Sequence, residues 1–144
     1  MERVDPTTRL GKLLDWCSRQ KATDLHAQAD RRYSFRIDGK LQRIMEDQFP
    51  APGNDAIVEM LHEAFSTSIY ERIERQREMD FSFLCAGMRY RANFSKQQGK
   101  QSFSFRVVPQ NMMPFADLGL PATILDLIRE PRGLIVVAGA AGQG

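Results

Sequence analysis

The chain has 144 residues, 42% of them hydrophobic, which is enough for one ordinary domain with a packed core and excludes a disordered protein. Its 20 basic and 18 acidic residues leave a net charge of +2, too small to indicate a nucleic-acid or membrane partner. Cys17 and Cys85 lie far apart with no C-x-x-C pair, which argues against a disulfide scaffold or zinc site and favours a cytoplasmic protein. No stretch is long enough to span a bilayer.

The first element predicted from the sequence is an amphipathic helix. Asp5-Pro6-Thr7 is typical of a helix start, and Leu10, Leu13, Leu14 and Cys17 then recur on one face at helical spacing. This apolar face predicts a helix that packs against the rest of its domain.

A β-hairpin and two more helices follow. Residues 32–37 alternate between polar and apolar side chains, Asp38-Gly39 supplies the positive φ angles of a tight turn, and residues 40–44 return. After a break rich in proline, apolar residues at 57–65 and 69–73 indicate two helices that pack on one face of a sheet.

Three further strands are predicted at 79–83, 89–94 and 103–107, the last with a regular alternation of apolar and polar side chains. The front of the chain is therefore predicted to be α+β, an antiparallel sheet with helices. The two prolines within 109–114 fit neither helical nor strand periodicity, so we place a domain boundary after Val108.

The end of the chain has the pattern that opens a nucleotide-binding domain. A short helix ends before Pro131, and the apolar run 134–138 then has the length and β-branched content of a buried parallel strand. It leads into the G-x-x-x-x-G frame of a Walker A loop, whose backbone N–H groups bind phosphate. The candidate nucleotide-binding residues are Gly139, Ala140, Ala141, Gly142, Gln143 and Gly144. The lysine and the Ser or Thr that complete such a loop are absent, so no catalytic residue is named and we expect the 144-residue chain neither to hydrolyse ATP nor to bind it tightly.

A resemblance to a known family rests on seven segments, in order and at characteristic spacing: A-T-D-L-H at 22–26, F-R-I-D-G-K-L at 35–41, M-D-F-S-F at 79–83, R-Y-R-A-N at 89–93, F-R-V-V-P at 105–109, L-G-L-P at 118–121 and R-G-L-I-V-V at 132–137. Over nearly its whole length the chain resembles the type IV pilus retraction ATPases (PilT/PilU type) of the type II/IV secretion-ATPase superfamily. It departs from the family pattern at Ala141, where the family has Thr, and at Gln143, where the family has Ser.

The resemblance implies a PAS-like N-terminal domain at 1–108, an interdomain linker at 109–116 and the start of a RecA-like ATPase domain at 117–144, truncated at Walker A. It implies a parent protein that uses ATP and Mg²⁺ and forms a homohexamer, with each N-terminal domain on the neighbouring subunit's ATPase domain. Such a motor depolymerises type IV pili in twitching motility. It would be cytoplasmic and held at the inner membrane through a pilus platform protein, without inserting into the membrane, binding nucleic acid or holding a structural metal.

The strands beyond residue 88 carry the candidate phosphate contacts. No acid occurs between Asp80 and Asp117, and Arg89 and Arg91 alternate onto the same strand face, so this face could meet a phosphate. The resemblance implies that Arg89, Arg91 and Arg106 reach the nucleotide of an adjacent subunit, as an arginine finger supplied in trans does. From the residues alone, a solvent-facing strand that uses arginine to stay soluble is the more common explanation.

Alternatives of another class are a stand-alone PAS-like interaction or ligand-sensing module without ATPase activity, and a nucleic-acid-binding sheet. Aromatic side chains that could stack single-stranded bases alternate along the strands: Tyr33, Phe35, Phe103 and Phe105. Asp24 and His26 are weaker candidates for a site, because a lone histidine on a strand more often has a structural role.

Overall fold

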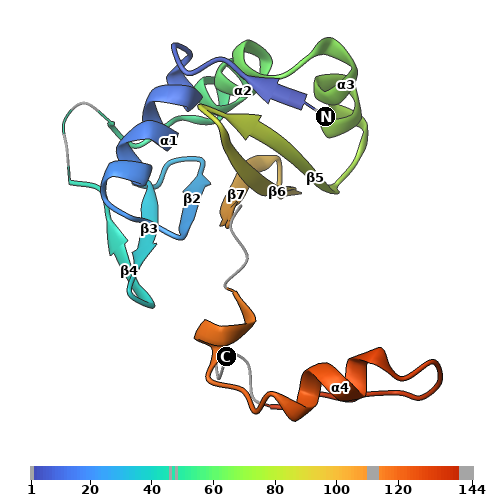
Figure 1. Cartoon of the computed structure of the whole chain (residues 1–144). Coiled ribbons are helices and arrows are strands. Elements are labelled where there is room, and N and C mark those ends of the chain that lie inside the picture. Colours follow the sequence, from blue (N-terminus) through green and yellow to red (C-terminus); the bar gives the residue numbers. More distant parts are fainter. Residues whose placement is uncertain (1, 46, 48, 110–113, 140–144) are drawn as a thin grey trace. The chain divides into compact units, whose positions relative to one another are not determined.

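The computed structural model describes residues 2–45, 47, 49–109 and 114–139, drawn in Figure 1. The chain divides into two compact units, Met1–Gln110 and Asn111–Gly144. Among the described residues, the first unit contains the sheet and three of the helices, and the second contains two short helices.

The first unit is a single mixed sheet with helices on one side. Its elements in chain order are β1 (Glu2–Val4), α1 (Arg9–Arg19), β2 (Asp24–Gln28), β3 (Ser34–Ile37), β4 (Lys40–Arg43), α2 (Asn54–Ala64), α3 (Thr67–Arg75), β5 (Glu78–Cys85), β6 (Met88–Gln97) and β7 (Lys100–Val108). The strand order is β1-β5-β6-β7-β2-β3-β4. Only β1 is parallel to its neighbour, and all other described pairs are antiparallel. The predicted α+β class is confirmed, with β1 as an addition that the sequence did not indicate.

The chain turns where the Asp38-Gly39 dipeptide predicts. Asp38 and Gly39 have φ angles of 47° and 74° and join β3 to β4, so the predicted hairpin is confirmed. These positive φ values suit glycine and, less readily, aspartate, which is why this dipeptide marks the turn in the sequence.

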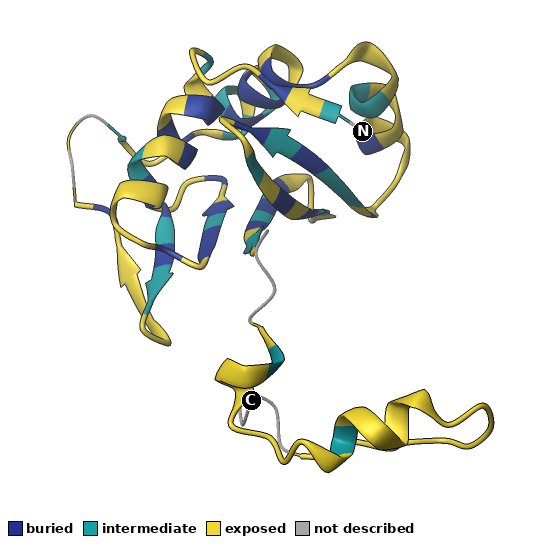
Figure 2. Ribbon diagram, in the orientation of Figure 1, coloured by how far each residue is buried: buried dark blue, intermediate teal, exposed yellow. Residues whose placement is uncertain are grey.

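The core lies between the helices and one face of the sheet, as the burial colours of Figure 2 show. Alternate residues of each strand point to the same face, and the apolar set includes Phe83, Phe94 and Phe105, each at most 2% exposed. Helix α1 adds Trp16, whose ring lies 5.1 Å from that of Phe35 in an edge-on contact. The opposite face of the sheet is therefore left to the polar residues of each strand.

Helix α1 begins at Arg9, slightly later than Asp5-Pro6-Thr7 suggested. Thr8 is the N-cap, and its hydroxyl accepts a hydrogen bond from the Gly11 N–H at 3.1 Å. Gly11 lies against the chain that enters the helix, since a Cβ at this position would be 2.6 Å from the Pro6 Cα.

The second unit holds the 3₁₀ helix η1 (Phe115–Leu118) and helix α4 (Thr123–Arg129). The strand expected over 134–138 is not formed, and residues 134–139 have no regular secondary structure. A strand needs a neighbouring strand to pair its backbone N–H and C=O groups, and the described part of this unit contains none. Leu134 and Val137 are consequently 86% and 95% exposed.

Candidate functional site

A row of charged side chains crosses the polar face of the sheet. The strand register places Arg91 of β6 opposite Arg106 of β7. Arg106 in turn lies opposite Asp24 of β2, and Asp24 lies opposite Arg36 of β3. We call these four residues the charged row. It brings together three guanidinium groups and one carboxylate from segments far apart in the sequence.

Asp24 is the centre of the row and is only 7% exposed. Its carboxylate accepts a hydrogen bond from the Arg106 Nε at 2.7 Å and one from the Thr23 hydroxyl at 2.9 Å. The Arg36 Nε lies 3.5 Å from Oδ2 of the same carboxylate. The Arg106 side chain nevertheless remains 71% exposed. Asp24 thus holds Arg106 near the base of its guanidinium group while much of that side chain faces solvent.

The electrostatics of Asp24 follow from these contacts. Burial by itself raises the pKa of the carboxyl, but the hydrogen bonds from Arg106 and Thr23 and the charge of Arg106 outweigh burial, so the pKa lies below its ordinary value of 3.8. Asp24 is therefore ionised at neutral pH. One carboxylate does not balance three guanidinium groups, so the row as a whole carries positive charge.

Arg91 and Arg89 continue the positive surface along β6. The Arg91 side chain is 68% exposed, and its terminal nitrogen lies 3.7 Å from Asp80 of β5, a loose surface ion pair. Arg89 lies two residues earlier on the same face, opposite Val108, and is exposed. The three arginines expected to contact phosphate therefore share one face, with Arg91 and Arg106 side by side and Arg89 at its margin.

A shallow hollow of about 330 Å³ lies beside Arg91 and Arg106, with Asp24 and His26 in its lining. His26 is half-buried, and burial lowers the pKa of its imidazole below 6.5, so the ring is neutral at pH 7. A neutral imidazole offers one donor and one acceptor, whereas the arginines offer only donors. Asp80 also lines the hollow, so its two arginines face two carboxylates, and the guanidinium nitrogens left exposed at Arg91 and Arg106 are the groups that can bind an anion.

Two residues of this site were not singled out in the sequence. Arg36 and Asp80 were read only as parts of strands, although each lies two residues from another polar residue of its strand. That alternation could have placed them on the polar face. Their contacts depend on which strands become neighbours: β3 beside β2 brings Arg36 to Asp24, and β5 beside β6 brings Asp80 to Arg91.

The base-stacking alternative loses its aromatic residues in the structure. Tyr33, Phe35, Phe103 and Phe105 are 7%, 6%, 3% and 2% exposed, so all four rings lie in the core rather than on the open face. Stacking of bases requires exposed rings.

The predicted phosphate loop lies almost wholly outside the described residues. Gly139 is described, and it is exposed and outside regular secondary structure. Ala140, Ala141, Gly142, Gln143 and Gly144 are not among the described residues, so the loop stays a prediction.

The two cysteines belong to the buried core. Cys17 and Cys85 are free and buried, and burial raises the pKa of the Cys17 thiol to about 12, which keeps it protonated. No group of three or more His, Cys, Asp or Glu residues in the described part of the chain could hold a metal ion.

None of the described helices has the length and apolar character required to cross a membrane.

Comparison with known proteins points to one class. No protein-family model matches the chain. Over 134 residues it is 28% identical to the type IV pilus retraction ATPase PilT of Pseudomonas aeruginosa, covering 92% of this chain and 38% of that protein. Over 112 residues it is 27% identical to a twitching motility protein of Neisseria gonorrhoeae, covering 76% of this chain and 29% of that protein.

A crystal structure of the pilus retraction motor PilT with bound ADP matches the fold, with a TM-score of 0.73 and 27% identity over 85% of this chain and 35% of that one. The chain therefore spans only 29–38% of the length of these relatives. Fold and sequence together confirm the resemblance to the N-terminal region of a pilus retraction ATPase. Within that class, the similarity is to the pilus retraction ATPases of the PilT type.

Proposed function

We propose that this chain is the N-terminal part of a homohexameric, ATP-driven motor that retracts type IV pili and so drives twitching motility. The similarity to PilT of Pseudomonas aeruginosa and to the PilT crystal structure supports this proposal. Residues 1–108 form its PAS-like domain, 109–116 its linker and 117–144 the beginning of its RecA-like ATPase domain. The motor works in the cytoplasm, at the inner membrane, through a pilus platform protein.

In this proposal Arg91 and Arg106 contact the γ-phosphate of ATP bound by a neighbouring subunit, and Arg89 supports them from the margin of the face. The single observation that carries the proposal is the pair Arg91 and Arg106, adjacent in register, with Arg106 held by Asp24 at 2.7 Å. An arginine already fixed at its Nε loses less side-chain freedom when its terminal nitrogens bind phosphate. Asp24 is thus a positioning residue for Arg106.

The chemistry required of these arginines is electrostatic. During transfer of a phosphoryl group, negative charge builds up on the phosphate oxygens, and a guanidinium supplied in trans stabilises it. The loop 139–144, completed by the lysine and hydroxyl residue expected after it, would cradle the same nucleotide in its own subunit together with Mg²⁺. The 144-residue chain alone lacks those two residues, so we expect no ATP turnover from it.

The test is ATP hydrolysis by the full-length parent protein carrying Arg91→Gln and Arg106→Gln together. We expect kcat to fall by about 10²–10³-fold, the loss seen when one strong transition-state donor is removed. Arg72→Gln is the matched control, because Arg72 is an exposed arginine of α3. Size-exclusion chromatography should show an unchanged oligomer. A double variant with the kcat of the control would mean that these arginines serve only to keep the strand face soluble.

A further inference from the structure

A second group of arginines borders the same polar face, away from Arg91 and Arg106. Arg31 and Arg32 lie in the loop between β2 and β3, and Arg43 is the last residue of β4. All three are exposed, and none forms an ion pair with a described residue. They line a trough of about 790 Å³, which we call the basic trough. Three cations with no ion-pair partner among the described residues thus gather at one concave surface.

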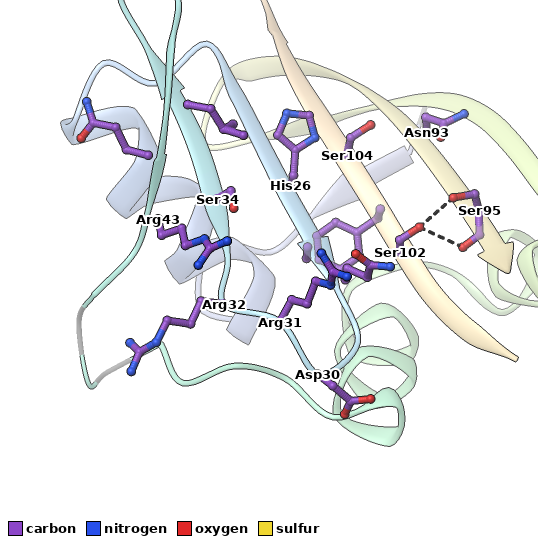
Figure 3. Close-up of a pocket in the computed structure, with 15 residues that line it drawn as sticks. His26, Asp30, Arg31, Arg32, Ser34, Arg43, Asn93, Ser95, Ser102 and Ser104 are labelled. Atoms are coloured by element: carbon purple, nitrogen blue, oxygen red, sulfur yellow. Dashed lines mark hydrogen bonds between the residues drawn. The ribbon is translucent and has the colours of Figure 1, made fainter. Parts of the chain in front are cut away.

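The strand register explains why these side chains converge. Arg43 lies opposite Ser34 of β3, Ser34 lies opposite His26 of β2, and His26 lies opposite Ser104 of β7. This line runs parallel to the charged row, two residues away from it on each of β2, β3 and β7. Figure 3 shows Arg31 and Arg43 reaching in over the strands that carry Ser34 and Ser102, whereas Arg32 points out of the trough.

The floor of the trough consists of hydroxyl and amide groups. Ser34, Ser104 and Asn93 contribute to it, and the Ser102 hydroxyl lies 2.7 Å from that of Ser95. The only acid among the residues that line the trough is Asp30, which is already bound to the Lys100 ammonium at 2.9 Å. The described lining of the trough therefore presents guanidinium and hydroxyl donors, and its single carboxylate is engaged by Lys100.

We propose that the basic trough binds a ligand bearing two or more phosphate groups, with Arg31 and Arg43 as its charged contacts and the serine hydroxyls as its neutral ones. Guanidinium groups bind phosphate oxygens through paired, charge-assisted hydrogen bonds, and hydroxyls supply further donors. Two arginines that line one trough offer charged contacts for two phosphate groups rather than one. The volume lies within the range of small-ligand pockets. This second anion site has its own arginines but adjoins the hollow beside Arg91 and Arg106, with which it shares His26, Asn93 and Ser104.

The proposal is tested on the 144-residue chain by titration with inorganic pyrophosphate, followed by calorimetry and by NMR shifts of the backbone amides. We expect saturable binding, with the largest shifts at Arg31, Ser34, Arg43 and Ser102. Arg31→Gln together with Arg43→Gln should weaken binding at least tenfold. Because both side chains are exposed, this variant should keep the fluorescence of Trp16 and the unfolding midpoint of the wild type.

Two matched variants make the outcome specific. Arg19→Gln with Arg72→Gln removes the same amount of charge from α1 and α3, on the other face of the sheet, and should leave the affinity unchanged. Arg91→Gln with Arg106→Gln should also leave it within about twofold, since those residues do not line the trough. This last variant separates the trough from the proposed motor site.

A parallel titration with ADP identifies the source of the phosphates. Tighter binding of ADP than of pyrophosphate would support the trough as a nucleotide site, and equal binding would support it as a site for the diphosphate group alone. The proposal is overturned if pyrophosphate does not saturate, if the double variant at Arg31 and Arg43 binds as well as the wild type, or if binding depends instead on Arg91 and Arg106. In a competition experiment, a poly-glutamate peptide is added first and pyrophosphate is then titrated in. The proposal is also overturned if the peptide occupies the trough and pyrophosphate does not displace it.

Discussion

Asp24 is buried among three donors, so the loss of its negative charge should destabilise the first unit. Asp24→Asn keeps the shape of the side chain but replaces an acceptor of Arg106, Arg36 and Thr23 with a neutral amide. We expect the free energy of unfolding to fall by about 2–3 kcal/mol, the effect of weakening charge-assisted hydrogen bonds at a buried carboxylate. Urea denaturation followed by the fluorescence of Trp16, the single tryptophan, measures it.

Asp80→Asn is the control for this change. The Asp80 side chain is 53% exposed and lies 3.7 Å from Arg91, so its replacement should cost less than about 1 kcal/mol. Equal losses in the two variants would show that the Asp24 contacts contribute no more than an ordinary surface ion pair.

The pH dependence of stability should reveal the same carboxylate. The pKa of Asp24 in the folded state lies below its ordinary value of 3.8. Between the folded and the unfolded pKa, the unfolded state therefore binds more protons than the folded state, and stability rises with pH. The contribution of Asp24 is complete above the unfolded pKa and is lost as the pH falls through the folded pKa. The difference in unfolding free energy between wild type and Asp24→Asn should therefore shrink below about pH 4. A difference that stays constant from pH 7 to pH 2.5 would contradict this assignment.

At the level of residues, the sequence predicts which side chains share a strand face but not which meet across strands. Arg89 and Arg91 could be assigned to one face from their spacing alone. The hydrogen bond from Arg106 to Asp24 joins residues 82 apart, so it depends on the pairing of β2 with β7. The spacing of residues along a strand does not determine which strands become neighbours. The contacts of Asp24 could therefore not be predicted from the sequence.

Among the helices and strands, α1 leads to the sharpest prediction, which concerns Gly11. A Cβ at this position would clash with backbone atoms of Asp5 and Pro6, including the Pro6 Cα at 2.6 Å, and these atoms cannot move without displacing the helix start. Gly11→Ala should lower stability by about 1–3 kcal/mol despite the better helix propensity of alanine. Thermal unfolding measures the change.

Gly53→Ala is the comparison for this variant. Gly53 has an extended backbone with φ of −67°, and a Cβ there would meet nothing within 4 Å. Gly53 is the N-cap of α2, where glycine is preferred over alanine, so its replacement should lower stability by less than about 1 kcal/mol. If Gly11→Ala behaves in the same way, the entry to α1 is looser than the structure indicates.

The elements found and missed from the sequence differ in how local their signals are. The hairpin of β3 and β4 and the strands β5 to β7 carry period-two alternation and turn residues in their own sequence, and all are confirmed. β1 is three residues long and forms only because β5 lies beside it. The run 134–138 shows the converse, because a strong strand pattern remains irregular without a neighbouring strand.

For the whole molecule, the two units should differ in stability. Every residue of the described buried core lies between Val4 and Phe105, so the first unit contains a complete core of its own. Residues 1–109 alone should therefore unfold cooperatively within about 2 °C of the 144-residue chain. Differential scanning calorimetry of both chains tests this.

The same comparison should reveal the effect of the exposed apolar run. Leu134, Ile135, Val136 and Val137 are at least 50% exposed, and such a surface promotes association. Light scattering should show less aggregation for residues 1–109 than for the 144-residue chain. A large loss of melting temperature on shortening would contradict the independence of the first unit.

The position of β7 in the sheet has a consequence for synthesis of the protein. β7 lies between β6 and β2, so it joins the early meander β2–β3–β4 to the late meander β5–β6–β7. A ribosome that adds about 5–20 residues per second needs about 4–16 s to move from β2 to β7. During that interval β2 offers an unpaired sheet edge, the kind of surface on which nascent chains aggregate. The domain can close its sheet only once residues 100–108 have emerged, which makes its last strand the step that commits the chain to the native fold.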